Sequence, residues 1–198
     1  MTGTHITSTD SMVDRESLPT DSTVDRESLP VELVDEQGRA TGICPVSDAH
    51  TAPGRLHRAF SVLLFGPDGR VLLQQRATVK TRFPLRWSNT CCGHPAPGQS
   101  LAEAAAVRLG EELRVRAELR EVGVYRYRAE DPATGRVEDE WDHVLIGEFA
   151  GVPDHPDPAE VAAVRWAEPD RLEADIASAP ADFTPWLHGV LAAARAGR

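Results

Sequence analysis

Two apolar segments joined by a short turn set the framework of this chain. FSVLLF (60–65) and RVLLQQ (70–75) flank GPDG, an arrangement that is typical of a β-hairpin. Further strands are predicted over VELVD (31–35), which the turn-like EQGRATG follows, and over WDHVLIGEF (141–149) and VAAVRWAE (161–168). The chain is therefore expected to contain a β-sheet.

Two helices are predicted among and after these strands. SLAEAAAVRLGEEL (100–113) is rich in helix formers and begins with Ser100 and Glu103 at the spacing of a capping box. The last helix is expected to begin with Thr184 as its cap and Pro185 at its first position, and to run through WLHGVLAAARA. This order of elements indicates an α+β fold in which helices sandwich a sheet.

Size and charge limit the classes of protein that the chain can represent. Its 198 residues, 41% hydrophobic and 26% charged, suit one globular domain with a sizeable core. With 21 Lys and Arg against 31 Asp and Glu, the net charge is -10, which argues against a nucleic-acid partner. An anionic substrate would need a local cationic site.

The organisation of the chain changes near residue 30. DSMVDRESLP (10–19) recurs as DSTVDRESLP (21–30), and both copies are polar, acidic and without apolar periodicity. We therefore expect residues 1–30 to form a disordered tail and residues 31–198 to form the domain. A helical 11-residue repeat is the competing interpretation, but each copy offers little more than one Val and one Leu for an apolar stripe.

The amino-terminal sequence and the cysteines indicate a reducing compartment. MTGTHITSTDSMVDRES has no apolar core of signal-peptide length, and no run of the chain is long enough to span a bilayer. We expect a cytoplasmic protein without membrane association. The 3 cysteines, two of them adjacent, do not make a disulfide framework.

The adjacent cysteines lie in SNTCCGHPAPG (88–98). A structural zinc site is disfavoured because no second ligand pair is nearby, and a C-x-x-C redox pair is absent. Cys91 is assigned to the core, where buried cysteines are common. Cys92 is a site candidate because Gly93 lets the backbone turn sharply and His94 brings an imidazole beside an ionisable thiol.

Histidines and acids elsewhere add further candidates. His50 and His57 lie in AHTAPGRLHRAF, the second at the entrance to a predicted strand. In VEDEWDHV, Glu138 and Glu140 are two residues apart on the approach to a strand, so both carboxylates are expected on one face. A single histidine is more often a satisfied polar residue than a ligand, but three histidines with two acids give a metal site a chemical basis.

The predicted helix at 100–113 carries a damaged form of the Nudix box, G-x5-E-x7-R-E-U-x-E-E-x-G-U, in which U is apolar. Over residues 93–115 the matching positions are Gly93, Leu109, Glu111, Glu112 and Val115. The replaced positions are Gln99 for the first acid, Val107 and Arg108 for the Arg-Glu pair, and Arg114 for the last glycine. Since the acids of this motif hold the metal ions that activate a hydrolytic water, their loss argues against diphosphate hydrolysis.

Together these features resemble type 1 isopentenyl-diphosphate delta-isomerases, a Nudix-fold family that does not hydrolyse its substrate. The resemblance spans residues 31–190 and is carried by AHTAPGRLHRAFSVLLF, VLLQQRATVK, FPLRWSNTCCGHP, the GEEL helix, YRYRAEDPATGRVEDEWDH and FTPWLHGV. It implies a Nudix-like mixed sheet and the interconversion of isopentenyl and dimethylallyl diphosphate, in isoprenoid biosynthesis, through a tertiary carbocation. The partner would be a small isoprenoid diphosphate, and we expect a monomer.

The resemblance also implies roles for individual residues. Cys92 and Glu140 would transfer protons from opposite sides of the substrate, with Tyr127 hydrogen-bonded near the glutamate and Trp186 against the carbocation. One divalent ion, Mg²⁺ or Mn²⁺, would be held by His50, His57, His94, Glu138 and Glu140. A second Mg²⁺, held through Glu112, would bridge to the diphosphate.

Cationic residues must then bind the diphosphate, and the resemblance assigns this role to Arg76 and Lys80 in QQRATVK. At one position the chain departs from the family pattern, which usually has a lysine in a K-x-x-x-H arrangement. Here Val46 stands in CPVSDAH, so an anion contact is missing or is supplied from elsewhere.

Two other functions fit the same sequence. A Nudix-type diphosphohydrolase would release phosphate or diphosphate from its substrate. A non-catalytic binder of isoprenoid diphosphates, which the valine at position 46 motivates, would show no turnover.

Overall fold

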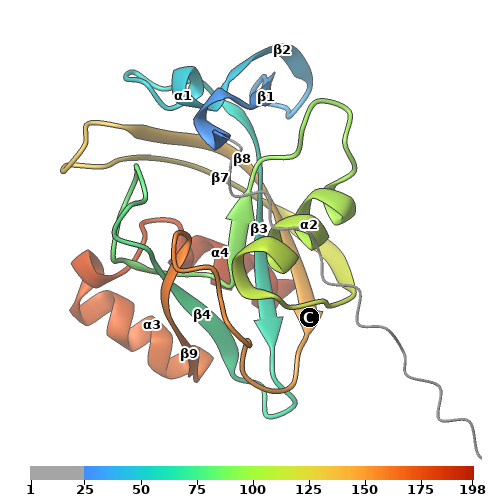
Figure 1. The fold of residues 1–198 in the computed structure, drawn as a ribbon, viewed down its shortest axis with the longest axis vertical. Helices are drawn as coiled ribbons and strands as arrows, with labels where there is room; N and C mark the ends of the chain where they lie inside the picture. The colour runs from blue at the N-terminus through green and yellow to red at the C-terminus, as the bar shows by residue number, and fades with distance from the viewer. Residues whose placement is uncertain (1–24) are drawn as a thin grey trace, which may run out of the picture.

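The computed structural model describes residues 25–198, in which nine strands form one sheet with helices on both faces (Figure 1). The strands are β1 (Pro30–Val34), β2 (Ala40–Pro45), β3 (His57–Phe65), β4 (Val71–Arg76), β5 (Trp87–Ser88), β6 (Cys91–Gly93), β7 (Leu119–Glu130), β8 (Val137–Glu148) and β9 (Val161–Ala167). The helices are α1 (Val46–Ala49), α2 (Leu101–Leu113), α3 (Pro169–Ser178) and α4 (Leu187–Ala196), with 3-10 turns η1 (Arg26–Ser28) and η2 (Pro180–Asp182). The predicted α+β fold is confirmed.

The centre of the sheet is β3, which pairs with β1, β4, β6 and β8. Its partner β8 is parallel, whereas β1, β4 and β6 are antiparallel to it, so the sheet is mixed. On the outside, β7 pairs with β8 and β9 pairs with β4, both antiparallel. The predicted hairpin of β3 and β4 is present, and it provides one half of this framework.

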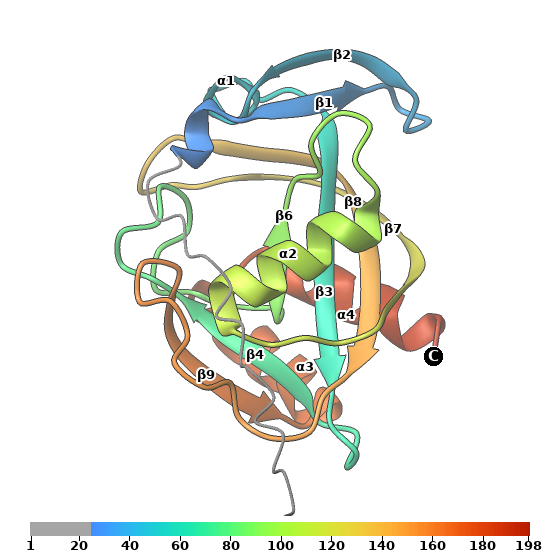
Figure 2. The same cartoon turned by 45° about the vertical axis from the view of Figure 1, so that its right-hand side comes forward.

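Alternate side chains of β3 enter two separate cores. Leu63 and Phe65 belong to a cluster with residues of α3 and α4, whereas Phe60, Val62 and Leu64 belong to a cluster with residues of α2. In Figure 2, α2 lies in front of β3 and α4 lies behind it. Because successive side chains of a strand point to opposite faces, a nearly continuous apolar run is what a strand covered on both faces requires.

The helix α2 agrees with its prediction within one residue. The side chain of Ser100 caps it by accepting a hydrogen bond from the backbone nitrogen of Glu103 at 3.3 Å. The helix ends at Arg114, which adopts a left-handed conformation with φ 57°. This is the position where the Nudix box has glycine, and a non-glycine residue there costs about 1 kcal/mol.

The prediction for the last helix was wrong at its start. The helix α4 begins at Leu187, and Thr184 precedes it in a turn. The hydroxyl of Thr184 donates to Ser88 Oγ at 3.2 Å, and its carbonyl accepts from the nitrogen of Leu187 at 3.2 Å. Threonine therefore fastens the turn to β5 instead of capping the helix. The longer elements that were not predicted are β2, β7 and α3, and the short elements α1, β5, β6, η1 and η2 were not predicted either.

The predicted disordered tail covers residues 1–30, of which residues 1–24 lie outside the described residues. For residues 25–30 the prediction was wrong. Asp25 caps η1 by accepting from the nitrogen of Glu27 at 3.1 Å, and Pro30 opens β1. Ion pairs from Arg26 to Glu111 and from Glu27 to Arg82 attach this segment to the domain.

A third, smaller core lies under β1, β2 and α1, at the top of Figures 1 and 2. Its members are Val31, Leu33, Cys44, Val46 and Ala49. This cluster fixes the short helix α1, whose last turn delivers a histidine to the site. Within residues 25–198, no helix has the length and apolar character needed to cross a membrane.

Candidate metal centre and proton-transfer site

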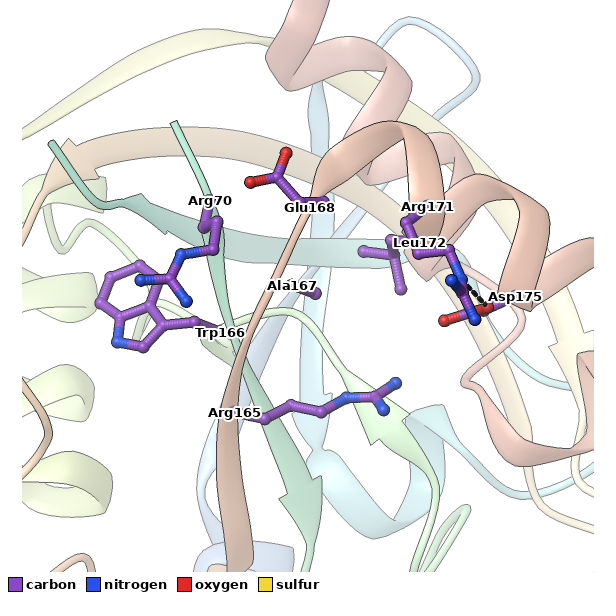
Figure 3. A pocket seen from close by; sticks show the side chains of 8 residues that line it. All are labelled: Arg70, Arg165, Trp166, Ala167, Glu168, Arg171, Leu172 and Asp175. Carbon is purple, nitrogen blue, oxygen red and sulfur yellow. Dashed lines mark hydrogen bonds and ion pairs between the residues drawn. The ribbon is translucent and has the colours of Figure 1, made fainter. Parts of the chain in front are cut away.

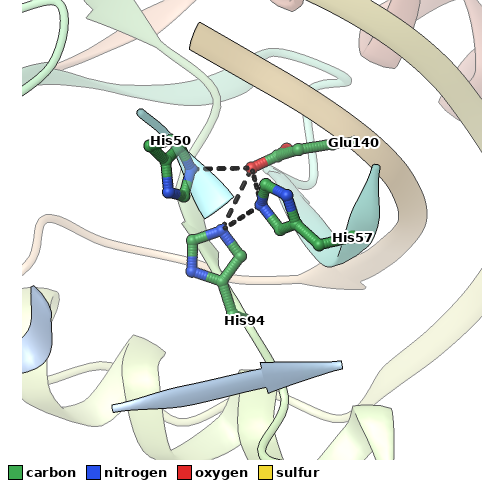
Figure 4. Close-up of side chains that lie close together, drawn as sticks. All are labelled: His50, His57, His94 and Glu140. Carbon is green, nitrogen blue, oxygen red and sulfur yellow. Dashed lines mark hydrogen bonds and ion pairs between the residues drawn. The ribbon is translucent and has the colours of Figure 1, made fainter. Parts of the chain in front are cut away.

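The register of the central strands brings the histidine and glutamate candidates together. His57 opens β3 and lies opposite Glu140 of β8, and Tyr127 of β7 lies opposite the same glutamate on the other side. His50 directly follows α1, and His94 directly follows β6. Segments far apart in the sequence therefore direct their side chains to one point (Figure 4).

Three imidazoles surround the carboxylate of Glu140. Its Oε1 lies 3.1 Å from Nε2 of His94, 3.6 Å from Nε2 of His57 and 4.0 Å from Nε2 of His50. One donor atom from each of the four residues lies within 4.8 Å of the others. Neutral imidazoles with a carboxylate are a donor set that suits divalent transition metals.

Hydrogen bonds to the backbone orient two of the imidazoles for a metal. Nδ1 of His50 donates to the carbonyl of Val46, and Nδ1 of His57 donates to the carbonyl of Arg55, both at 2.7 Å. Since a carbonyl only accepts, Nδ1 carries the proton in both rings and Nε2 is left to bind a metal. The buried Nε2 of His50 has no partner with hydrogen-bond geometry among residues 25–198. The residues therefore fit a divalent cation.

Glu138 was predicted on the same face as Glu140, and this is confirmed, but it lies at the margin of the cluster. Its Oε2 is 2.7 Å from Nε2 of His50, while its Oε1 accepts from Nε of Arg82 at 3.1 Å. Asp139 points to the other face, where it pairs with Arg126 at 3.0 Å. One oxygen of Glu138 therefore lies beside the histidine–glutamate cluster, and the other accepts a hydrogen bond from Arg82.

Burial and neighbouring charges shift the pKa values of the cluster in opposite directions. Burial would lower the pKa of His50, but the charge of Glu138 raises it to about 9. Burial lowers the pKa of His94 to about 4. For Glu140, burial would raise the pKa, but the neighbouring imidazoles of His50, His57 and His94 hold it well below its usual range. A metal bound to the Nε2 atoms would displace the proton of His50, so metal binding is coupled to proton release.

The adjacent cysteines point to opposite faces of β6, and both are free thiols. Cys91 is fully buried in the core beneath α2, as predicted. Cys92 packs against the opposite core, with its Sγ 3.7 Å from Oδ1 of Asn89, and burial raises the pKa of its thiol to about 12. Cys92 therefore shares a face of the sheet with Tyr127 and Trp186.

Gly93 has a different role from the one predicted. It lies in β6, paired with Phe60 of β3, and not in a sharp turn. A Cβ atom at this position would lie 3.0 Å from the ring of Phe60 and 3.3 Å from Cγ of Arg108. Glycine is needed here because β6 is squeezed between a core aromatic ring and the α2 helix.

Asn89 is a site residue that the sequence analysis missed. Its fully buried side chain donates from Nδ2 to the carbonyl of Cys91 at 2.7 Å. Its Oδ1 accepts from Nε1 of Trp186 at 3.0 Å and lies beside the thiol of Cys92. The only signal was its place in SNTCCGHP, and asparagine in such a segment is as typical of a turn.

Aromatic rings lie between the thiol of Cys92 and the cluster of His50, His57, His94 and Glu140. The ring of Trp186, 3% exposed, stacks on Tyr127 with centroids 5.6 Å apart and meets the edge of Phe83 at 5.3 Å. The hydroxyl of Tyr127 donates to Oε2 of Glu140 at 2.6 Å. Burial and the charge of Glu140 hold the pKa of Tyr127 well above its usual value, so the phenol stays protonated.

The two predicted diphosphate-binding residues have different surroundings. Arg76 donates from Nε and Nη2 to the carbonyl of Arg82, at 3.1 and 2.9 Å, and its guanidinium carbon lies 5.7 Å from the ring centre of Trp186. Lys80 forms an ion pair with Glu160. Arg76 therefore borders the aromatic part of the site, and Lys80 lies in an ion-pair network beside it.

Glu112 stands apart from the histidines. Its buried carboxylate accepts from Nε2 of Gln74 at 2.9 Å and pairs with Arg108, which stands one helical turn earlier. Arg108 also pairs with Glu111 at 2.8 Å. The arginine that replaces a Nudix-box acid thus forms ion pairs with both acids that are retained.

The structure explains the valine at position 46. Its side chain is buried in the small core under β1 and β2, and its carbonyl orients His50. The side chain therefore does not face the site.

A surface pocket of about 320 Å³ lies along β9 and α3 and is separate from the site. Its lining residues are Arg70, Arg165, Trp166, Ala167, Glu168, Arg171, Leu172 and Asp175 (Figure 3). Two of its arginines are already paired, Arg70 with Asp68 and Arg171 with Asp175.

Comparison with known proteins first identifies the class. The NUDIX domain family model matches residues 55–187. Among solved structures, a protein from Deinococcus radiodurans has a TM-score of 0.65, 21% identity and coverage of 81% of this chain and 96% of its own. A NUDIX hydrolase from Nitrosomonas europaea has a TM-score of 0.53, 18% identity and coverage of 70% and 88%. At these identities the likeness shows the fold alone, and the matched model makes this a NUDIX-domain protein.

Closer relatives identify the branch within that class. A protein of Nocardia farcinica named isopentenyl-diphosphate Delta-isomerase is 69% identical over 161 residues, which are 81% of this chain and 91% of the relative. Proteins of the same name from Halorhodospira halophila and Streptomyces griseus are 45% and 48% identical, and the matches cover 92% and 83% of their lengths. The chain belongs to the isopentenyl-diphosphate Delta-isomerase family.

Proposed function

We propose that this protein interconverts isopentenyl diphosphate and dimethylallyl diphosphate in isoprenoid biosynthesis. The observation that carries this proposal is a continuous series of contacts between a thiol and a carboxylate. The thiol of Cys92 touches Asn89, which bonds the indole of Trp186, and this ring stacks on Tyr127, whose hydroxyl bonds Glu140. A proton-transfer group thus lies at each end of an aromatic surface.

This arrangement suits the chemistry of an unactivated alkene. Such an alkene is a very weak base, so protonation needs a positioned acid in a site from which water is excluded. The resulting tertiary carbocation needs stabilisation by a group that does not trap it, and the face of an aromatic ring provides this. Trp186 and Tyr127 are both buried and both lie between the two proton-transfer groups.

The proton balance defines the roles of Cys92 and Glu140. One of them gives a proton to the terminal carbon, a carbocation forms at C3, and the other removes a proton from C2 as the new double bond forms. After one turnover a proton has moved from the donor to the acceptor, so exchange with solvent must reset the pair. Tyr127 holds the carboxylate through its hydrogen bond of 2.6 Å.

We propose that His50, His57, His94 and Glu140, with Glu138 at the margin, hold one divalent ion, Mg²⁺ or Mn²⁺. When bound, the ion would orient the carboxyl group of Glu140 and change its acidity. Arg76 and Lys80 would bind the diphosphate. The carboxylate of Glu112, an oxygen ligand of the kind that Mg²⁺ prefers, would hold a second Mg²⁺ next to the diphosphate.

Conversion of isopentenyl diphosphate in deuterated water, followed by NMR, tests this function. Isomerisation incorporates solvent deuterium into both isoprenoid diphosphates and gives dimethylallyl diphosphate. Recovery of unlabelled isopentenyl diphosphate, with metal supplied, would contradict the proposal and would favour a non-catalytic binder.

A NUDIX diphosphohydrolase is the competing enzyme, and the ion pairs of α2 argue against it. Hydrolysis in this fold relies on metal ions held by several acids of the Nudix helix. Here Arg108 pairs with both Glu111 and Glu112, so a cationic side chain occupies the place where the motif has a further acid for metal ions. Release of phosphate or diphosphate from isopentenyl diphosphate, without dimethylallyl diphosphate, would support the hydrolase instead.

A further inference from the structure

The carboxylate of Glu160 is the meeting point of three cationic side chains. Its Oε2 pairs with Nζ of Lys80, and its Oε1 lies 3.2 Å from Nη2 of Arg108 and 3.4 Å from Nε of Arg26. The side chain of Glu160 is only 13% exposed, so water and salt screen these contacts weakly. These cations come from the loop after β4, from α2 and from η1.

The backbone fixes Glu160 in this place. Its carbonyl accepts from the nitrogen of Ala77 at 2.9 Å, which joins it to the loop that carries Lys80. Its nitrogen donates to the carbonyl of Asp157 at 3.0 Å, and the nitrogen of Asp157 donates to the carbonyl of Glu112 at 2.9 Å. Backbone hydrogen bonds on both sides of Glu160 therefore hold this residue next to the loop that carries Lys80 and next to the end of α2.

An oxyanion held by a lysine and an arginine is also what a phosphate group requires. The charges in this network cancel, because Arg26, Lys80 and Arg108 are matched by Glu111, Glu112 and Glu160. A diphosphate, as a multiply charged anion, would meet no net attraction here while all three carboxylates stay in place.

We propose that Glu160 is an internal anion that holds Lys80 and Arg108 in the absence of substrate and competes with the substrate's diphosphate for them. Diphosphate binding then requires exchange of these contacts, and Glu160 sets the affinity of the site for isoprenoid diphosphates. This inference rests on the proposed diphosphate site at Lys80. The inference predicts that removing the carboxylate of Glu160 strengthens diphosphate binding. If Glu160 only supported the fold of the site, its removal would weaken binding.

Calorimetric titration with inorganic diphosphate, at fixed Mg²⁺ and low salt, tests the inference. Glu160→Gln should lower the Kd for diphosphate about tenfold, on the scale of one charge-assisted contact. The KM for isopentenyl diphosphate should fall in parallel. The matched control is Glu173→Gln, which also removes one negative charge but only from an exposed pair with Arg195. Its Kd should stay within about twofold of the parent, which separates local competition from a change in net charge.

A second comparison assigns the effect to the lysine. In a Lys80→Gln background, Glu160→Gln should improve affinity much less than it does in the parent, because the contact under competition is gone. Glu160→Asp, which withdraws the carboxylate by one methylene group and keeps its charge, should show a smaller gain and serves if the glutamine variant fails to fold.

An unchanged or higher Kd in folded Glu160→Gln would overturn the inference while leaving the proposed function intact. If the parent converts isopentenyl diphosphate but does not bind inorganic diphosphate through Lys80, the assigned diphosphate site fails, and the inference fails with it. If the parent binds diphosphate but catalyses no isomerisation, the proposed function fails instead.

Discussion

Replacing each of the two adjacent cysteines by alanine separates catalysis from packing within one short strand. Because β6 directs Cys91 and Cys92 to opposite faces, the two substitutions remove the same atom from different environments. Cys91→Ala removes it from the core under α2. Cys92→Ala removes it from the face that carries Tyr127 and Trp186.

The expected magnitudes follow from these environments. Cys91 is 0% exposed, so losing its sulfur leaves a small cavity and should cost about 1 kcal/mol of unfolding free energy. For a domain of this size that corresponds to roughly 2–4 °C in Tm, and kcat should stay within about tenfold of the parent. Cys92→Ala should instead lower kcat by about 10³-fold or more, the scale of losing a general acid or base.

The assay combines thermal unfolding with the rate of deuterium incorporation into the product. Circular dichroism of both variants provides the control for folding. Equal losses of kcat from the two substitutions would refute the assignment, because a face-specific role cannot affect both positions alike. So would a Cys92→Ala variant that still exchanges label at the parent's rate.

Three further predictions concern the metal, the third core and the indole. Chelation should abolish turnover, Mg²⁺ or Mn²⁺ should restore it, and His57→Ala should lose metal by elemental analysis; full activity of metal-free protein would contradict the site. Val46→Lys should lower Tm by several degrees without lowering KM, since it places an ammonium group in an apolar cluster; a lower KM at unchanged Tm would show that the position faces the diphosphate. Trp186→Phe should keep much of the activity, whereas Trp186→Leu should lose about thirtyfold in kcat, as a cation-π contact of roughly 2 kcal/mol predicts, and also some stability. A leucine variant with the parent's kcat would remove the indole from the mechanism.

Local patterns predicted the parts of the fold that depend on local energetics. The hairpin of β3 and β4 follows from two apolar runs around a turn, and α2 follows from its capping box and its helix formers. The start of α4 was wrong because Thr184 uses its hydroxyl for Ser88, which is distant in sequence. A cap and a tertiary hydrogen bond compete for the same oxygen, and only the tertiary structure decides between them.

The alternation of side chains along a strand predicted that Glu138 and Glu140 share a face, and both do lie near Nε2 of His50. It could not predict that Arg82 would take one oxygen of Glu138, because the two residues meet only through the tertiary fold. The same limit applies to Asn89 and Glu160. Each is ordinary in sequence, and each acquires its role from contacts made across the sheet.

The replacement of a Nudix-box acid by Arg108 shows how one fold separates isomerisation from hydrolysis. Retained acids on α2 would otherwise form a cluster of negative charge able to gather several metal ions around a water molecule. The guanidinium of Arg108 bonds Glu111 and Glu112 at once and reaches Glu160 as well, so this side of the site is an ion-pair network suited to anion exchange. The histidines and Glu140, delivered by α1, β3, β6 and β8, gather the metal donors at a different place. The group of donor atoms that could hold a metal ion therefore lies around Glu140, which the proposed function makes a proton-transfer residue. Arg108→Glu, which restores the acid of the motif, should accordingly weaken diphosphate binding while leaving metal binding at the histidines unchanged, and a loss of both would show that the two sites are not independent.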